Sequence, residues 1–302
     1  MGGDVFSLAP HRLGESADEV LGWSLQRMCL EGPETELTRT EYAQPALYAV
    51  SFAMWELWSA ESDAPPLAAA GHSLGEYTAL AAAGVVDFFD GLALVAARGR
   101  AMAEAADAAP SGMAALIGAD FDTAEALAAA RRREGGALWV ANLNAPGQVV
   151  VAGGQVDIEW LGDNARSHGV RRAVPLKVAG AFHSPFMEPA ARALSKAIAA
   201  VEFDEAAFPV WANATGRPHT TRVGDVLRDQ LTSPVRFADS LRGMAAAGAD
   251  TFVHIGPGDV TAGLARRSVE GAEVLAVSTV ADISSAASAL GPPSSREGQN
   301  AI

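Results

Sequence analysis

Apolar residues recur at helical spacing through the first part of the chain. The pattern covers residues 16–30, which we expect to form one amphipathic helix, and residues 41–59, where Pro45 stands near the helix start and is tolerated. Residues 33–37 are predicted to be a connector between these two helices. The N-terminal region is therefore predicted to be helical.

Strand patterns then alternate with helical ones. A short apolar run at residues 67–70 predicts a strand, and residues 87–106 predict a further long helix. Later in the chain, residues 208–212 and 251–255 are predicted strands, with a weaker third at 274–277. Helical stretches separate these strands, and this alternation is typical of the α/β class.

A distinct pattern begins at residue 113. Strands and helices follow one another in the order βαββαβ, which is a ferredoxin-like unit. The strands are predicted at 113–118, 137–143, 148–152 and 171–178, and the helices at 122–133 and 157–168.

The βαββαβ unit interrupts the larger α/β pattern, so we expect an inserted domain. The large domain is predicted to comprise residues 1–111 and 180–290, and the small domain residues 112–179. Residues 291–302, rich in Pro, Ser and Gly, are predicted to be a disordered tail.

Length, composition and charge narrow the function classes. The chain has 302 residues, about half of them hydrophobic, enough for a well-buried core. A net charge of −14 argues against a nucleic-acid partner, since phosphate binding needs a basic face. No apolar run is long enough to cross a membrane, so we expect a soluble, cytoplasmic protein. Cys29 is the single cysteine and is expected to fill the core.

The strongest chemical signal is the run Gly71-His72-Ser73-Leu74-Gly75-Glu76 between a predicted strand and a predicted helix. Gly-x-Ser-x-Gly in this position is the nucleophile-elbow pattern, which exposes the serine hydroxyl over the first N–H groups of a helix. We expect side chains at either flanking glycine to collide with the neighbouring strand or helix. The run predicts acyl transfer through an ester on Ser73, and the alternative is an ordinary helix-capping serine.

A serine nucleophile needs a base, and the chain offers six histidines. The side chain of His72 is expected to point away from Ser73. His183 follows the last strand of the inserted unit, at the lip of a cleft between the two domains, and so ranks first. The alternative for any one of the six is a surface or capping histidine.

An arginine could hold a substrate carboxylate through two parallel hydrogen bonds. Arg98 is the candidate, on the predicted helix that follows the elbow helix. Arg100 cannot share its helix face, so at most one of the two should point at the site. A solvated surface arginine is the alternative for both.

Six motifs together give the chain a family resemblance over residues 31–290. It resembles malonyl-CoA:acyl carrier protein transacylases, including the acyltransferase domains of polyketide synthases. The motifs are Gln44-Pro45-Ala46-Leu47, Gly71-His72-Ser73-Leu74-Gly75-Glu76-Tyr77, Arg98-Gly99-Arg100-Ala101-Met102, Asn142-Leu143-Asn144-Ala145-Pro146-Gly147-Gln148-Val149-Val150, Ala181-Phe182-His183-Ser184 and Gly256-Pro257-Gly258.

The resemblance implies an α/β-hydrolase-like large domain with an inserted ferredoxin-like small domain, and a ping-pong reaction. Ser73 would attack the malonyl thioester, with His183 as general base and later as the acid that protonates the coenzyme A thiolate. Arg98 would clamp the malonate carboxylate, and the Leu74 N–H would donate to the oxyanion. Further residues similar to those that line the family's site are Gln44, Asn142 and Asn144.

The resemblance also implies the partners. Malonyl-CoA would be the substrate, and the thiol of phosphopantetheine on an acyl carrier protein would be the acceptor. No metal or resident cofactor is expected, and the chain is expected to be a monomer. An acidic carrier protein would need a local basic patch on a chain of charge −14. Candidates on the predicted small domain, each also interpretable as solvated surface charge, are Arg131, Arg132, Arg133, Arg171, Arg172 and Lys177.

Phe182 bears on the choice of acyl group. Family members with Ala-Phe-His at this point resemble malonyl-specific enzymes, and the bulk of Phe182 would crowd an α-methyl group. Leu74 agrees with that specificity. Gly180 departs from the polyketide pattern, which usually has histidine there.

The start of the chain departs from the family pattern. Members usually open with a strand that ends in Phe-Pro-Gly-Gln-Gly-Ser-Gln, whereas this sequence opens at Met1-Gly2-Gly3-Asp4-Val5-Phe6. The absent loop usually supplies a second oxyanion donor, whose loss slows acylation by about 10²- to 10³-fold. We therefore expect an internal methionine as the start of this reading frame.

Two alternative functions follow from the same residues. The first is a hydrolase that uses Ser73 and His183 with water as the acceptor, since a carboxylate clamp does not exclude water. The second is a truncated, inactive domain that binds a carrier protein. A lipase-like esterase fits less well, because that class usually has an acidic residue between the serine and the histidine and lacks an inserted βαββαβ unit.

Overall fold

The computed structural model describes residues 1–290. Its N-terminal region is helical, as predicted, and leads into a long helix, α5 (Thr40–Glu61). The predicted single helix at residues 16–30 is wrong, because the chain breaks at Gly22, which adopts a left-handed conformation (φ 78°), and restarts with Ser24 as the helix cap. The short helices before α5 are α1 (Pro10–Leu13), α2 (Glu15–Leu21), α3 (Leu25–Glu31) and α4 (Glu34–Leu37).

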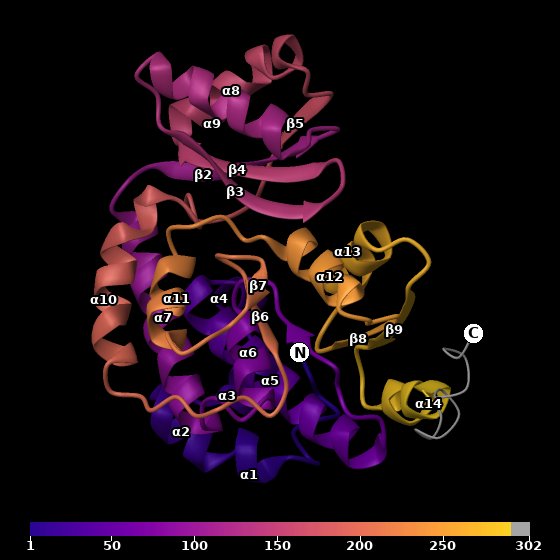
Figure 1. The fold of residues 1–302 in the computed structure, drawn as a ribbon. Coiled ribbons are helices and arrows are strands. Elements are labelled where there is room, and N and C mark those ends of the chain that lie inside the picture. The colour runs from indigo at the N-terminus through magenta and orange to yellow at the C-terminus, as the bar shows by residue number, and fades with distance from the viewer. Residues whose placement is uncertain (291–302) are drawn as a thin grey trace, which may run out of the picture.

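The body of the molecule carries short strands surrounded by helices (Figure 1). Strand β1 (Ala69–Ala70) pairs in parallel with β6 (Val210–Ala212), which pairs antiparallel with β7 (Arg217–Pro218). Strands β8 (Thr251–Ile255) and β9 (Glu273–Val277) form a separate parallel pair. The surrounding helices are α6 (Gly75–Ala82), α7 (Phe88–Asp107), α10 (Glu188–Ile198), α11 (Val223–Gln230), α12 (Phe237–Ala246), α13 (Val260–Ser268) and α14 (Ala281–Leu290), with a 3₁₀ turn at Pro185–Met187.

Helices α5 and α7 pack closely because a glycine lies at their crossing. A Cβ atom at Gly91 would lie 2.1 Å from the Tyr48 hydroxyl, so only glycine admits the tyrosine there. The Tyr48 ring stacks on Phe88, with centroids 5.5 Å apart, and its hydroxyl donates to the Phe88 carbonyl. This packing fixes the helix that carries Arg98.

An inserted four-stranded antiparallel sheet forms a second layer above the body (Figure 1). Its strand order is β3-β4-β2-β5, and two helices cover one face around a core of its own. This order matches the predicted ferredoxin-like unit. The elements are β2 (Ser111–Ile117), α8 (Phe121–Arg133), β3 (Leu138–Ala145), β4 (Gln148–Gly154), α9 (Gln155–Asn164), a 3₁₀ turn at Arg166–His168 and β5 (Arg172–Pro175).

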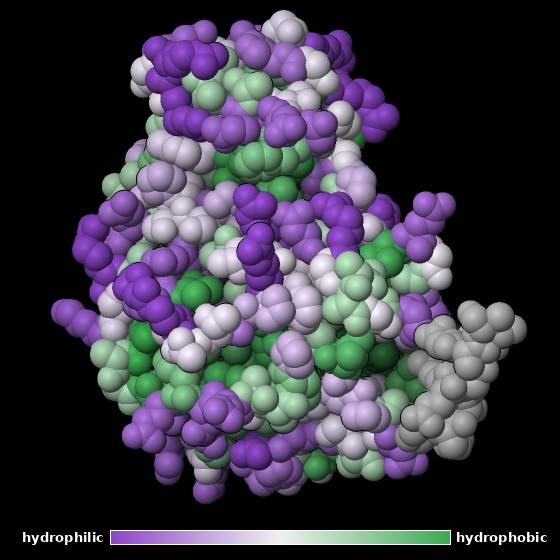
Figure 2. Space-filling model, viewed as in Figure 1, coloured by the Kyte–Doolittle hydropathy of each residue, from purple (hydrophilic) through white to green (hydrophobic). Residues whose placement is uncertain are grey.

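Strand β3 joins the inserted sheet to the body through two backbone hydrogen bonds. The Leu143 N–H donates to the Val235 carbonyl and the Val235 N–H donates to the Ala141 carbonyl, both at 2.8 Å. Val235 lies two residues before α12 and is fully buried. Figure 2 shows polar side chains over the outer part of the inserted layer and apolar ones near its junction with the body.

A largely apolar cavity of about 480 Å³ lies between the two sheets of the body. Strand β1 borders it on one side and β8 on the other, and each is the outermost strand of its sheet. The cavity reaches the elbow, since Gly71, Leu74 and Gly75 contribute to its wall. Within residues 1–290, no helix is both long and apolar enough to span a membrane.

Candidate active site

Ser73 lies in the turn between β1 and α6, as the elbow pattern predicts. Its φ is 52°, and His183 has a φ of 57°; within the described part of the chain, these are the two residues other than glycine with positive φ. A left-handed backbone conformation costs a side-chain-bearing residue about 1–2 kcal/mol. The surrounding structure therefore imposes this conformation on both residues, which is common at active sites.

The two glycines that flank Ser73 differ in what they permit. A Cβ atom at Gly71 would lie 1.9 Å from the Gly75 carbonyl carbon and 2.5 Å from the Glu76 nitrogen, so the expected collision at Gly71 is confirmed. The same expectation for Gly75 is wrong. A Cβ atom there would meet nothing within 4 Å, because this position faces the cavity.

Ser73 and His183 form a hydrogen-bonded pair. The Ser73 Oγ lies 2.7 Å from His183 Nε2, and His183 Nδ1 lies 2.9 Å from the backbone carbonyl of Gln230. A carbonyl oxygen only accepts, so Nδ1 carries the proton and Nε2 is left with a lone pair for the serine hydroxyl. A backbone carbonyl thus orients the base, in the place where many serine enzymes use a carboxylate.

Burial keeps His183 neutral. The side chain is 4% exposed, and burial lowers the pKa of His183 to about 3, with the nearby charge of Arg98 acting in the same direction. Its Nε2 is therefore free of a proton at neutral pH and can accept one from Ser73. Burial also lowers the pKa of His72.

Arg98 points into the same site, and Arg100 is exposed, so one of the two faces the site as predicted. The Arg98 guanidinium donates to Ser73 Oγ and to Gln230 Oε1, both at 2.9 Å, and to Gln44 Oε1. All three acceptors are neutral. The Nε–H finds no acceptor within residues 1–290, although Arg98 is only 1% exposed. A buried cation without a carboxylate partner is costly unless an anion binds to it.

The other predicted residues occupy different parts of the site. The Leu74 N–H lies at the start of α6 and has no hydrogen-bond acceptor within the described chain, so it can serve an oxyanion. Asn144 bonds to His72 Nε2 at 2.8 Å, which turns His72 away from Ser73 as expected. Asn142 is buried on β3. Phe182 is half-buried and packs against apolar residues of both layers.

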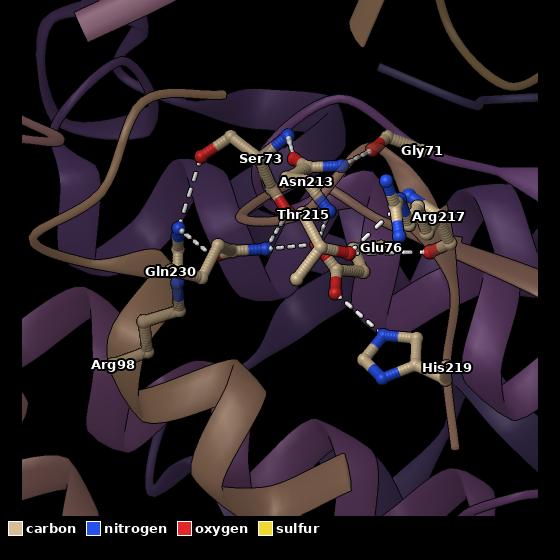
Figure 3. A network of polar contacts seen from close by, with 9 residues as sticks. All are labelled: Gly71, Ser73, Glu76, Arg98, Asn213, Thr215, Arg217, His219 and Gln230. Atoms are coloured by element: carbon tan, nitrogen blue, oxygen red, sulfur yellow. Dashed lines mark hydrogen bonds and ion pairs between the residues drawn. The ribbon is translucent and has the colours of Figure 1, made fainter. Parts of the chain in front are cut away.

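Four polar residues beneath Ser73 were not predicted from the sequence: the buried Glu76, Asn213 and Gln230, and the half-buried His219 (Figure 3). Gln230 ends α11 and contacts Ser73, Arg98 and His183. Nothing in the local pattern marks Gln230, Asn213 or His219. Glu76 had a signal, because Ser73-Leu74-Gly75-Glu76 matches the capping-box pattern. Its side chain instead points inward, away from that capping role.

The inserted layer leaves some of the predicted basic residues exposed to solvent and pairs others with acidic side chains. Arg131 pairs with Asp157 at 2.6 Å and Arg132 with Glu125. Arg171, Arg172 and Lys177 are exposed on β5 and the residues that flank it. The second group is therefore the stronger candidate for contact with an acidic partner. Within residues 1–290, no cluster of His, Cys, Asp and Glu could hold a metal ion.

Comparison with known proteins matches this geometry to a family. A model of the acyl transferase domain matches residues 2–289. The malonyl CoA-acyl carrier protein transacylase of Bacillus subtilis is 39% identical over 282 residues, covering 92% of this chain and 89% of the relative. A polyketide-biosynthesis malonyl CoA-acyl carrier protein transacylase of Bacillus velezensis is 40% identical over 262 residues, covering 84% and 87%. A malonyl-transacylase solved in complex with a type II polyketide synthase acyl-carrier protein superposes with a TM-score of 0.89 at 34% identity, covering 95% of this chain and 93% of that one.

Proposed function

The chain belongs to the acyl transferase domain family, and on that premise we propose that it moves a malonyl group from coenzyme A to the phosphopantetheine thiol of an acyl carrier protein. The observation that carries the proposal is the buried, carboxylate-free Arg98 beside the Ser73–His183 pair. A substrate with a free carboxylate three atoms from its thioester sulfur would supply the missing anion.

The first half-reaction forms an ester on Ser73. As Ser73 Oγ bonds to the thioester carbonyl carbon, its proton passes to His183 Nε2. The Leu74 N–H donates to the oxyanion of the tetrahedral adduct. Collapse of the adduct breaks the carbon–sulfur bond, and His183 returns the proton to the sulfur of coenzyme A.

The second half-reaction reverses these roles. The phosphopantetheine thiol gives its proton to His183 Nε2, its sulfur attacks the ester carbonyl, and the proton returns to Ser73 Oγ as the ester bond breaks. Arg98 holds the malonyl carboxylate through both halves, with Gln44 fixing the far side of the guanidinium. Asn142, Asn144 and Phe182 form the adjoining wall, and Phe182 favours malonyl over an α-methylated group.

An acyl carrier protein is the proposed partner because the structural relative is a malonyl-transacylase in complex with one. The exposed Arg171, Arg172 and Lys177 give an acidic partner a local attraction on a chain of net charge −14. One copy of the chain holds Ser73, His183 and Arg98 together, so we propose a monomer that needs no resident cofactor. The lone Cys29, reduced and buried, fits a cytoplasmic setting.

Incubation with malonyl-CoA labelled in the malonyl group tests the proposal. We expect label on Ser73, none on a Ser73→Ala variant, and transfer of the label to added holo carrier protein faster than release to water. Faster release to water would instead establish the hydrolase alternative. Absence of label from Ser73 would contradict the proposed activity.

A further inference from the structure

Glu76 is a fully buried carboxylate one turn beyond the nucleophile. Its Oε2 accepts hydrogen bonds from the Asn213 backbone N–H at 2.9 Å and from Gln230 Nε2 at 2.6 Å, and its Oε1 lies 2.7 Å from His219 Nε2. Figure 3 shows these partners converging on it, Asn213 and His219 from the β6–β7 hairpin and Gln230 from the end of α11. A carboxylate this buried is tolerated only when its lone pairs are engaged, and these contacts engage them.

We propose that Glu76 is a positioning residue for acyl transfer, acting through Gln230 and Asn213 on Ser73, His183 and Arg98. This inference rests on the proposed function and adds a residue to it. Glu76 touches neither the reacting atoms nor the substrate position, so its effect is transmitted by the Gln230 amide and the Asn213 backbone N–H, which it holds.

Glu76 fixes the orientation of the Gln230 amide. Both acceptors of Gln230 Nε2, the Ser73 carbonyl at 3.0 Å and the Glu76 carboxylate at 2.6 Å, can only accept. The NH₂ end must therefore face them, and Oε1 must face Arg98, which donates to it at 2.9 Å. If the amide turned over, its NH₂ group would confront the Arg98 cation and its oxygen would confront a carbonyl and a carboxylate.

Gln230 also orients the base, His183. The Gln230 backbone carbonyl accepts from His183 Nδ1, so anchoring the Gln230 side chain restrains the carbonyl that sets the histidine tautomer. Gln230 thus contacts the nucleophile, the base and the carboxylate clamp. The hydrogen bond to Glu76 anchors the Gln230 side chain to the buried interior.

Asn213 connects Glu76 to the elbow backbone. Its N–H is held by Glu76, its Oδ1 accepts from the Ser73 N–H at 2.6 Å, and its Nδ2 donates to the Gly71 carbonyl at 2.7 Å. These two side-chain bonds bridge the turn from the Gly71 carbonyl to the N–H of the left-handed Ser73. Glu76 therefore supports the elbow and the clamp at once.

The hydrogen bonds to Glu76 also hold its carboxylate out of a direct ion pair with Arg98, and its charge acts on the guanidinium only through space. Within the described chain its oxygens are engaged by Asn213, Gln230 and His219, and Arg98 bonds only to neutral acceptors. The Nδ1 atom of His219 is buried without a partner, and its Nε2–H donates to the Glu76 carboxylate. The cation of Arg98 stays available for a substrate carboxylate.

Variants of Glu76 test this role. In Glu76→Leu the amide of Gln230 loses its anchor, and we expect the rate of Ser73 malonylation to fall about 10- to 100-fold, the effect of one lost buried hydrogen bond to a charged group. Glu76→Gln should restore most of the rate. Its amide oxygen can accept from Gln230 and Asn213 while its NH₂ group donates to His219 in the other tautomer. With acetyl-CoA, which lacks the carboxylate, the leucine variant should lose less than with malonyl-CoA.

A double-variant cycle separates positioning from general loss of stability. If Glu76 acts through Gln230, the Glu76→Leu/Gln230→Leu variant should be no slower than Gln230→Leu alone.

Asp157→Leu is the matched control, because Asp157 is also a buried carboxylate, bonded to Arg131 and the Ala137 N–H in the inserted layer. It should lower the unfolding midpoint and leave malonylation of folded protein unchanged. If Glu76→Leu fails to fold, Glu76→Ala is used in its place, because the space left by the shorter side chain admits water. We expect its rate of Ser73 malonylation to fall at least about tenfold.

The outcomes distinguish this inference from the proposed function. Malonylation of Glu76→Leu within twofold of the parent protein, or losses that multiply in the double variant, would overturn the role of Glu76 and leave the acyltransferase proposal intact. If the parent protein is not malonylated, the proposed function fails. The role of Glu76 is then tested by sulfonylation of Ser73 with phenylmethanesulfonyl fluoride. An unchanged sulfonylation rate in Glu76→Leu would overturn it.

Discussion

Ser73 and His183 hold a backbone conformation that side-chain-bearing residues seldom adopt. Hydrogen bonds restrain both residues. Asn213 and Gln230 bond to the backbone of Ser73, and the Gln230 carbonyl bonds to the ring of His183. The conformation brings Oγ and Nε2 to 2.7 Å. The reactive geometry is therefore maintained at the expense of local stability.

Replacing Ser73 by glycine and by alanine separates these two contributions. Both variants lose the nucleophile, but only glycine enters the left-handed region without a steric penalty. We expect Ser73→Gly to be more stable than Ser73→Ala by about 1 kcal/mol. Urea unfolding of the two variants measures the difference, and an alanine variant of equal or greater stability would contradict the strain at Ser73.

The lowered pKa of His183 predicts an activity that persists in acid. A histidine of ordinary pKa, near 6.5, would lose about tenfold of its neutral form by pH 5.5. Because burial lowers the pKa of His183 to about 3, the rate of Ser73 acylation should stay flat between pH 7.5 and 5.5. Single-turnover acylation measured across this range checks the prediction, and a tenfold decline at pH 5.5 would contradict it.

The same shift acts on stability with a definite sign. Between pH 3 and 6.5 the unfolded chain binds a proton at residue 183 that the folded protein excludes, so the free energy of unfolding should fall as the pH drops below about 6.5. His183→Gln removes this titration. Its free energy of unfolding should therefore vary less between pH 7 and pH 5 than that of the parent protein, by about 1 kcal/mol or more.

At the residue scale, the sequence predicted the groups that react and missed those that hold them. Ser73, His183 and Arg98 lie in local patterns that a turn or a family motif marks, and the structure brings all three together. Gln230, Asn213 and His219 reach the site from segments more than a hundred residues away from Ser73. Their role depends on three-dimensional convergence, which no local spacing encodes.

At the scale of elements, long helices and the βαββαβ unit were predictable because their periodicity extends over many residues. Helices α5 and α7 match the predicted ranges within a few residues, and the inserted sheet has the predicted element order. The break at Gly22 was missed, because the apolar spacing continues across it while the backbone turns. The strand before the elbow was predicted at 67–70, but only Ala69–Ala70 pair with β6.

The elbow itself makes a testable contrast between its glycines. Gly71→Ala places a methyl group into the Gly75 carbonyl, so we expect it to destabilise the protein by about 3 kcal/mol or more and to abolish acylation. Gly75→Ala faces open space and should change stability by no more than about 0.5 kcal/mol, with acylation retained. Urea unfolding and Ser73 labelling of both variants provide the measurement. Equal damage from both substitutions would show that the space beside Gly75 is occupied in solution.

For the whole molecule, charge distribution matters more than net charge. A chain of charge −14 would repel an acidic carrier protein unless a local cationic surface receives it. Arg171 and Arg172 are exposed at the outer edge of the inserted layer, with no ion-pair partner within residues 1–290. The basic run on α8 is instead largely engaged with neighbouring acids.

Charge reversal at Arg171 and Arg172 should therefore weaken carrier-protein docking. We expect the Arg171→Glu/Arg172→Glu variant to raise the apparent KM for carrier protein severalfold while malonylation of Ser73 by malonyl-CoA is unchanged. The effect should shrink at high ionic strength, because salt screens exposed charges. Arg133→Glu is the control for added negative charge on the same layer, and an equal rise in KM there would argue against a specific docking surface.

The junction between the inserted layer and the body also governs how the molecule can move. The two backbone hydrogen bonds between β3 and residue 235 lie beside the Asn144–His72 contact, while β5, the strand that precedes His183 in the chain, is at the opposite edge of the same sheet. A swing of the inserted layer would have to break these bonds together, so breathing of the cleft is expected to be a single concerted event. An acyl group on Ser73 would then meet its acceptor only when the whole layer opens, and the rate of that opening would set the lifetime of the ester.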